Sequence, residues 1–299
     1  MGAIKNIAYK FENKVKITEK RQFIQDLNLL SFPDLLSLPV NRYVTPFAII
    51  TSRGCPGDCV YCSSRAMSGK NYRMRSAESI FSEIFYLSEK IMKNHYNLKS
   101  YIAIYDDTFT VNTNRLKKFC NYMIDSGLNK FLWKCESRID VLTEELIVLM
   151  RTAGCFAIHV GVESADQSVV NSLNKHINLD KIETALKVMN QNGIQPLCSF
   201  IIGNHEDTHI TLENTKRFIE HIIRTYRAKV AISPNTPLPG TPLYNFPDQY
   251  GIKIKSKNWD DYSLTNAIID TKNLTSNEIR KYYVEITEFS EVMEGKSSD

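Results

Sequence analysis

The chain has 299 residues, of which 43% are hydrophobic and 23% are charged. These values are typical of globular proteins and exclude a disordered chain, while the length suits one α/β domain of barrel size or two smaller domains. The net charge of +4 indicates a mildly basic surface and not a nucleic-acid-binding one, so we expect no nucleic-acid partner.

The chain begins with an irregular extension and then alternates between strand and helix patterns. Two short strands are predicted at 4–9 and 14–18, and a leucine- and proline-rich connector covers 27–46. The predicted strands that follow are 47–51, 101–105, 131–135, 157–162, 196–202 and 229–232. The predicted helices are 77–94, 114–126, 143–152, 166–173, 180–192 and 211–226, and a final helix covers 276–294.

This alternation indicates a parallel sheet with helices outside it. The six units, of about 30 residues each, are too few for a closed eight-unit barrel, which needs about 250 residues. We therefore predict an α/β fold, a partial (β/α)6 TIM-like barrel over residues 47–235. A short N-terminal extension or connector covers residues 1–46, and a C-terminal extension with a helical tail covers residues 236–299.

Seven cysteines carry the main chemical signal of the sequence. No secretion signal follows Met1 and no apolar run is long enough for a membrane span. We therefore expect a cytoplasmic protein without a membrane partner, in which clustered cysteines bind metals or act in catalysis. Three of them form a C-x3-C-x2-C run, Cys55-Pro-Gly-Asp-Cys59-Val-Tyr-Cys62, directly after the first barrel strand.

Three thiolates on one tight loop suit an iron–sulfur cluster. A [4Fe–4S] cluster has four irons, and the other cysteines (Cys120, Cys135, Cys155 and Cys198) are scattered singly, so one iron would stay open to chelate a small molecule. Structural zinc is the alternative, but it prefers four protein ligands, and the sequence has no second cysteine pair.

In this context the cysteine run resembles that of the radical S-adenosylmethionine (SAM) superfamily, over about residues 47–245. The resemblance implies that the open iron binds SAM, and that one-electron reduction yields a 5′-deoxyadenosyl radical that abstracts hydrogen from a substrate. It also implies an oxygen-sensitive enzyme with a flavodoxin- or ferredoxin-like electron donor.

The same resemblance implies a set of SAM contacts at the carboxyl ends of the strands. Tyr61 would lie against adenine, Asp106 or Asp107 would bind the amino group, and Lys175 would face the carboxylate. Because strand residues alternate between the two faces, Glu136 and Glu163 reach the ribose or amino group if they face the lumen. The resemblance also implies that Ser199 stands at a ribose-contacting position.

The segment Pro237-Leu-Pro-Gly-Thr-Pro-Leu-Tyr244 resembles the cobalamin-associated branch of that superfamily. A cobalamin domain has no room before Cys55, so cobalamin-dependent methyl transfer would need a separate corrinoid-carrying chain. The substrate is unidentified; an open barrel suits a peptide or another bulky molecule. Methyl transfer, epimerisation and oxidative tailoring all stay open.

Two other interpretations of the sequence compete with that of a radical enzyme. His205-Glu206-Asp-Thr-His209 spells H-E-x-x-H, which on a formed helix would be a zinc hydrolase site; here it follows a strand, before the predicted helix begins. A non-enzymatic iron–sulfur or SAM-binding module is the second alternative. As catalytic groups we consider His159, which alternates with Glu163, and His205, which could line the mouth of the site.

Overall fold

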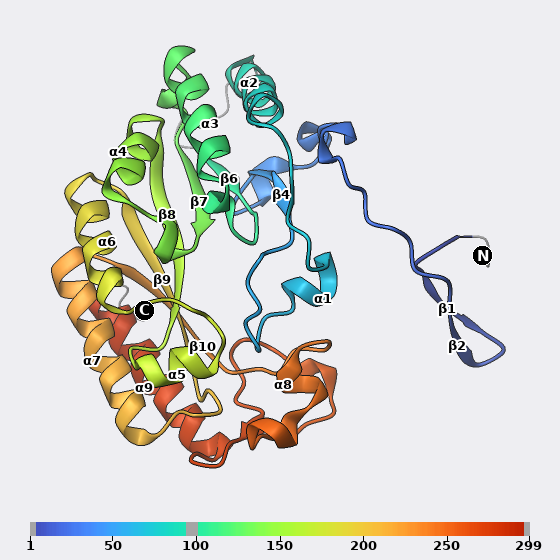
Figure 1. Cartoon of the computed structure of the whole chain (residues 1–299), viewed down its shortest axis with the longest axis vertical. Coiled ribbons are helices and arrows are strands. Elements are labelled where there is room, and N and C mark those ends of the chain that lie inside the picture. The colour runs from blue at the N-terminus through green and yellow to red at the C-terminus, as the bar shows by residue number, and fades with distance from the viewer. Residues whose placement is uncertain (1–3, 94–100, 296–299) are drawn as a thin grey trace.

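The computed structural model describes residues 4–93 and 101–295. Its centre is a six-stranded sheet of order β10-β9-β8-β7-β6-β3, in which every neighbouring pair is parallel. The strands are β3 (Phe47–Ile49), β6 (Ile102–Ile104), β7 (Trp133–Ser137), β8 (Cys155–Glu163), β9 (Gln195–Ile202) and β10 (Lys229–Pro234). Because β3 and β10 are both edges, the sheet is a partial barrel, as predicted (Figure 1).

Helices cover the convex face of this sheet (Figure 1). They are α2 (Ala77–Lys93), α3 (Thr113–Asp125), α4 (Glu144–Thr152), α6 (Asp180–Gln191) and α7 (His209–Tyr226). The short helix α5 (Gln167–Ser172) lies at the carboxyl end of the strands (Figure 1). Several begin at a side-chain cap, such as Asn112 before α3 and Thr143 before α4. Their apolar faces pack on the outward residues of the strands to form the hydrophobic core.

Strand alternation separates the core from the lumen. Along β9, Cys198, Phe200 and Ile202 are buried under the helices, whereas Leu197 and Ser199 lie on the half-buried inner face. Cys198 therefore faces the helices, and burial raises the pKa of its thiol to about 12. The inner face remains partly open, because six strands do not close around it.

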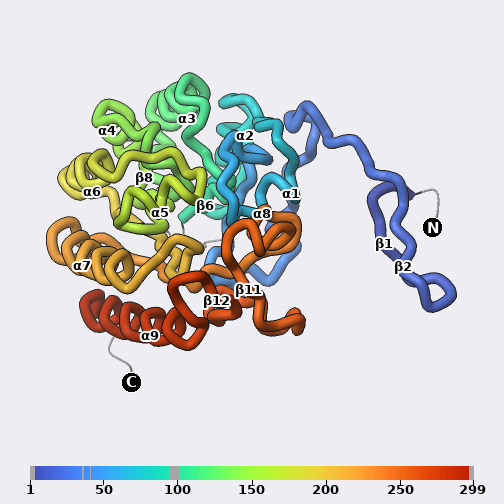
Figure 2. Tube along the Cα trace, turned by 60° about the horizontal axis from the view of Figure 1, so that its bottom comes forward, coloured from blue at the N-terminus to red at the C-terminus, as the bar shows by residue number. Residues whose placement is uncertain are grey.

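Two predicted strands are displaced. The strand expected at 131–135 is β7, Trp133–Ser137, because Phe131 still closes a 3-10 turn at Leu128–Lys130. The first strand of the extension is Ala8–Phe11 (β1), not 4–9, because Asn6 has a left-handed backbone with φ of 64°. It pairs with β2 (Lys14–Ile17) in an antiparallel hairpin that stands clear of the barrel in both Figure 1 and Figure 2.

Short elements complete the chain on either side of the barrel. After β3 come β4 (Ser52–Arg53), α1 (Ser64–Ser68) and β5 (Arg73–Met74), and β4 pairs with β5. After β10 come α8 (Pro242–Asn245), β11 (Lys253–Ile254), β12 (Ile269–Asp270) and α9 (Ser276–Met293). Helix α9 lies beside α7 (Figure 2) and buries Ile279 and Ile286. Among the described residues, none of the helices has the length and apolarity that a bilayer span requires.

Candidate functional site

The loop from Cys55 to Cys62, called the cysteine loop below, lies at the carboxyl end of the sheet, directly after β3 and β4. Cys55, Cys59 and Cys62 are half-buried, whereas the other four cysteines are buried. The buried Val60 fixes the loop, because its amide donates to the Leu173 carbonyl (3.1 Å). The structure thus presents three accessible thiols from one anchored loop and keeps the singletons in the core.

Gly57 lies close to the sulfur atoms of two cysteines of this loop. A Cβ at this position would lie 3.5 Å from the Cys55 Sγ and 3.9 Å from the Cys59 Sγ. It would also lie 3.5 Å from Nη1 of Arg138, whose guanidinium donates to the Lys175 carbonyl and to Asp140. A guanidinium therefore stands beside the sulfurs. We did not predict Arg138 as a site residue, although its place at the end of β7 was the available signal.

Lys175 is a second positive charge close to the thiols of the cysteine loop. Burial raises the pKa of the Cys59 thiol, and the positive charges of Lys175 and Arg138 act against that rise. Since metal-bound cysteine is a thiolate, cations at this position stabilise the charge state that a metal centre requires.

Tyr61, Glu163 and Lys175 form one hydrogen-bonded group next to the cysteine loop. The Tyr61 hydroxyl donates to Glu163 Oε1 (2.9 Å), and Lys175 Nζ donates to the same oxygen (2.6 Å) and to the Tyr61 hydroxyl (3.2 Å). Glu163 ends β8 with a left-handed φ of 70°, a conformation that is uncommon outside glycine and frequent at functional sites. Three residues predicted as SAM contacts are therefore brought together.

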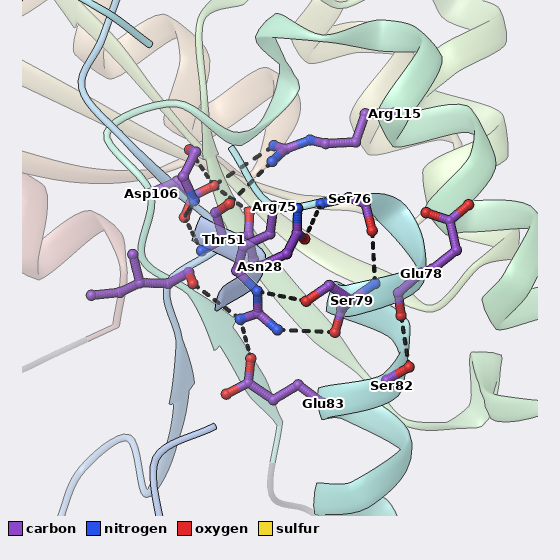
Figure 3. A network of polar contacts seen from close by, with 12 residues as sticks. Asn28, Thr51, Arg75, Ser76, Glu78, Ser79, Ser82, Glu83, Asp106 and Arg115 are labelled. Carbon is purple, nitrogen blue, oxygen red and sulfur yellow. Dashed lines mark hydrogen bonds and ion pairs between the residues drawn. The ribbon is translucent and has the colours of Figure 1, made fainter. Parts of the chain in front are cut away.

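The two predicted aspartates have different environments. Asp106 is buried, and its carboxylate accepts hydrogen bonds from the backbone amides and hydroxyls of Thr51 and Ser52 (2.5–2.9 Å). Arg115 lies 3.8 Å from the same carboxylate (Figure 3). Asp107 is exposed, and its charge adds to the burial that raises the pKa of Cys62. Asp106 therefore fixes the start of the cysteine loop, and Asp107 is the free carboxylate.

A second buried contact supports the same loop from the side of α2. Arg75 forms an ion pair with Glu83, and both side chains are almost fully buried (Figure 3). The Arg75 amide donates to the Thr51 carbonyl (2.8 Å), and its guanidinium to the Ile50 carbonyl (3.3 Å). Sequence reasoning missed this pair, because the partners are recognised only once α2 packs on β3.

Glu136 and His159 form a separate pair on the inner face of the sheet. They stand opposite each other on β7 and β8, with 2.6 Å between Glu136 Oε2 and His159 Nδ1. Both side chains are 32% exposed. Ser199 lies farther toward the carboxyl ends, beside Gly161 of β8. The lumen thus holds a carboxylate–imidazole pair open to solvent, below the level of the Tyr61, Glu163 and Lys175 group.

The H-E-x-x-H string does not form a zinc site. Helix α7 begins only at His209, so the string spans the turn before it. His205 is buried with its ring edge-on against Tyr250, whereas His209 contacts Tyr282 and Glu278. The two imidazoles therefore have separate surroundings, and a catalytic role for the buried His205 stays a prediction.

The residues present fit an iron–sulfur cluster with a zwitterionic ligand. In the described part of the chain, no three His, Cys, Asp or Glu side chains converge closely enough to hold a single metal ion. A four-iron cluster is larger than one ion and takes more widely spaced thiolates. The cationic and anionic groups of Lys175, Arg138, Glu163 and Asp107 stand beside the thiols, as a ligand with both charges requires.

Comparison with known proteins agrees with this fit. A family model described as the Radical SAM superfamily matches residues 49–219. The chain is 31% identical over 285 residues to an uncharacterized methyltransferase of Pyrococcus horikoshii, covering 94% of this chain and 60% of that protein. It is 26% identical over 291 residues to the anaerobic magnesium-protoporphyrin IX monomethyl ester cyclase of Rubrivivax gelatinosus, covering 93% and 49%.

Solved structures show the same fold. The radical SAM methyltransferase TsrM from Kitasatospora setae, with cobalamin and a [4Fe–4S] cluster bound, gives a TM-score of 0.60 at 16% identity, covering 71% of this chain and 40% of that one. The cobalamin-dependent SAM radical enzyme OxsB gives 0.58 at 17% identity, covering 99% and 43%. The chain thus spans 40–60% of the length of these proteins.

Both of these solved structures are of proteins that bind cobalamin or depend on it. The family model covers more than half of the chain. The chain therefore belongs to the Radical SAM superfamily, whose enzymes use a [4Fe–4S] cluster and S-adenosylmethionine and need an electron donor and a substrate.

Proposed function

We propose that this chain is the catalytic barrel of a radical SAM enzyme that modifies a bulky substrate on its open inner face. The observation that carries the proposal is the anchored loop of three half-buried thiols beside the hydrogen-bonded group of Tyr61, Glu163 and Lys175. Together with SAM, a cluster bound there supplies a 5′-deoxyadenosyl radical for hydrogen abstraction.

Cys55, Cys59 and Cys62 hold the cluster in this proposal, and the neighbouring residues hold SAM. Lys175 faces the SAM carboxylate and Asp107, the exposed carboxylate of the pair, takes the amino group. Glu163 and Ser199 accept from or donate to the ribose and amino groups, and Tyr61 borders the adenine. Asp106 acts through the loop that it anchors.

Glu136 and His159 have a different task from the SAM contacts. Their 2.6 Å pair lies deeper in the lumen, and each side chain is partly open to solvent. A carboxylate that orients an imidazole suits that imidazole to general acid–base work. We assign the pair to the substrate, where it holds or moves a proton at His159.

Methyl transfer is the reaction that the relatives favour, since methyltransferases recur among them. The barrel spans less than two thirds of those proteins, and a corrinoid supplied by another chain is compatible with an open inner face. Electron delivery would come from a flavodoxin- or ferredoxin-like protein.

The test is reductive cleavage of SAM by anaerobically reconstituted protein. We expect about four irons per chain, as the cluster type requires, and formation of 5′-deoxyadenosine. Cys55→Ala should lose both, whereas Cys198→Ala, which removes a buried thiol on the other face of β9, should keep both. Added S-adenosylhomocysteine formation would indicate methyl transfer; 5′-deoxyadenosine alone would indicate epimerisation or oxidation.

Zinc bound in place of iron, or iron content that Cys55→Ala does not change, would contradict the proposal. His159→Gln distinguishes the Glu136–His159 pair from the residues that hold the cluster and SAM. It should slow substrate turnover while leaving iron content and SAM binding as in the unsubstituted protein.

A further inference from the structure

A basic cavity lies between the N-terminal segment and the β4–α1–β5 segment. Its volume is about 550 Å³. Residues 20–24 form one wall, and β4, α1 and β5 form the other. Arg65 and Ala66 border both this cavity and a second one that Cys59 and Cys62 line. The basic cavity therefore adjoins the cysteine loop without containing any of its thiols.

The charge of this cavity is entirely of one sign. Five cationic side chains line it and no acidic side chain does: Lys20, Arg21, Arg53, Arg65 and Arg73. None of the five forms an ion pair with any residue that the structure describes. Clustered cations without counter-ions repel one another, and a bound anion would lower this repulsion.

Two of these arginines are forced together by the fold. Arg53 and Arg73 stand directly opposite each other in the β4–β5 pair, where like charges are destabilising. Burial, and next the charge of Arg53, lower the pKa of Arg73. An anion placed between the strands and the N-terminal segment would offset this repulsion.

Arg73 is also built in rigidly. Its side chain is buried, and its guanidinium donates to the carbonyls of Ile24 (2.7 Å) and Ser68 (2.9 Å). It stacks over the Phe23 ring at 4.6 Å, and that ring fits against Gly69, where a Cβ would meet it at 2.8 Å. These contacts fix Arg73 in the wall of the cavity, and the exposed side chains of Arg21 and Arg65 add two further cations.

We propose that this cavity binds a small polyanion of the phosphate class, held between Arg21 of the N-terminal segment and Arg53 and Arg65 of the opposite wall. Guanidinium groups match phosphate oxygens in paired hydrogen bonds. The volume falls within the range of about 300–1,000 Å³ that is typical of small-ligand sites. A concave site with a fixed floor favours a small ligand over the acidic surface of a protein.

Pyrophosphate titrated into the cluster-free 299-residue chain tests the proposal by calorimetry. We expect one saturable site whose affinity falls with added salt. Arg21→Gln with Arg65→Gln should weaken binding at least about tenfold, since each removes a charge-assisted contact. The matched control is Arg280→Gln with Lys281→Gln, two exposed cations of α9, which should leave the affinity unchanged.

A structural measurement accompanies the titration. Pyrophosphate should slow amide hydrogen exchange in residues 20–24, because it would join the two walls. Absence of saturable binding, or equal weakening in the control variant, would overturn the proposal. A third outcome would also overturn it: the Arg21→Gln, Arg65→Gln variant binds pyrophosphate normally, but its reconstituted cluster is no longer reduced by an acidic electron-transfer protein. The cavity would then be a protein-docking surface. The titration needs no cluster, so its result is independent of the radical chemistry.

Discussion

The side chains of Glu163 and Lys175 occupy the space that a side chain at position 161 would need. A Cβ on Gly161 would lie 2.3 Å from Glu163 Oε1 and 2.7 Å from Lys175 Nζ. Gly161→Ala should therefore displace the pair and weaken SAM binding by about tenfold or more, the loss of about one charge-assisted hydrogen bond. Iron content should stay at the unsubstituted level. Equilibrium SAM binding and iron analysis measure the two quantities.

Val160→Ala is the control for this prediction. Val160 neighbours Gly161 on β8, but it is fully buried in the core, so its truncation should lower the free energy of unfolding without changing SAM affinity. If Gly161→Ala bound SAM as tightly as the unsubstituted protein, Glu163 and Lys175 would not be SAM contacts.

Asp207 gives a prediction about pH. Burial raises the pKa of its carboxyl from 3.8 to about 6, although Thr211 and the Asn204 amide donate to it. The folded state then binds more protons than the unfolded state between those two values. The contribution of Asp207 to stability is therefore full below about pH 4 and falls as the pH rises to about 6, by about 3 kcal/mol at about 1.4 kcal/mol per pKa unit.

Asp207→Asn removes this dependence. The difference in unfolding free energy between the variant and the unsubstituted protein should grow in favour of the variant from pH 4 to pH 6 and then stay constant. Denaturant unfolding at a series of pH values measures it. A difference that does not change with pH would show that Asp207 ionises as readily in the folded as in the unfolded chain.

Among the elements, α9 approaches the end of β9 closely at Gly203. Gly203 has a φ of +73°, and a Cβ there would lie 2.6–2.8 Å from three carbons of Ile279. Gly203→Ala should thus cost about 1–2 kcal/mol for the left-handed backbone and about 1–3 kcal/mol more for overpacking against α9. Thermal or urea unfolding measures the total.

Gly127→Ala separates these two costs. Gly127 has a similar φ of +69°, but no atom lies within 4 Å of the added Cβ, so only the backbone cost applies. Equal losses in both variants would mean that α9 does not press on the turn after β9.

The elements were easier to predict than their contacts. Strand and helix periodicity placed the six barrel strands within a few residues, because local alternation reflects burial on one face. The β4–β5 pair escaped prediction, since two-residue strands have no periodicity. The different environments of Asp106 and Asp107 also depend on packing. Adjacent residues point to opposite faces, and only the folded loop shows that Asp106 is the one that accepts from Thr51.

The cysteine loop was predictable from spacing alone, whereas its surroundings were not. Arg138 reaches Gly57 from β7, and the Glu136–His159 pair forms across β7 and β8. Such contacts join residues that are far apart in the chain, so their register is fixed by the whole sheet. The domain limits at 46 and 235 stay a prediction, although α9 packs on α7 and β10 of the core.

The whole molecule has two extensions that differ in how they are attached. The β1–β2 hairpin stands clear of the barrel, with Val15 74% and Ile17 79% exposed, while α9 buries Ile279 and Ile286. Deleting residues 1–19 should therefore change the free energy of unfolding by less than about 0.5 kcal/mol. Deleting residues 276–299 should abolish the cooperative urea transition, because it uncovers the core at β9 and β10. Circular dichroism during urea unfolding compares the two, and a cooperative transition without α9 would show that the barrel core is complete without it.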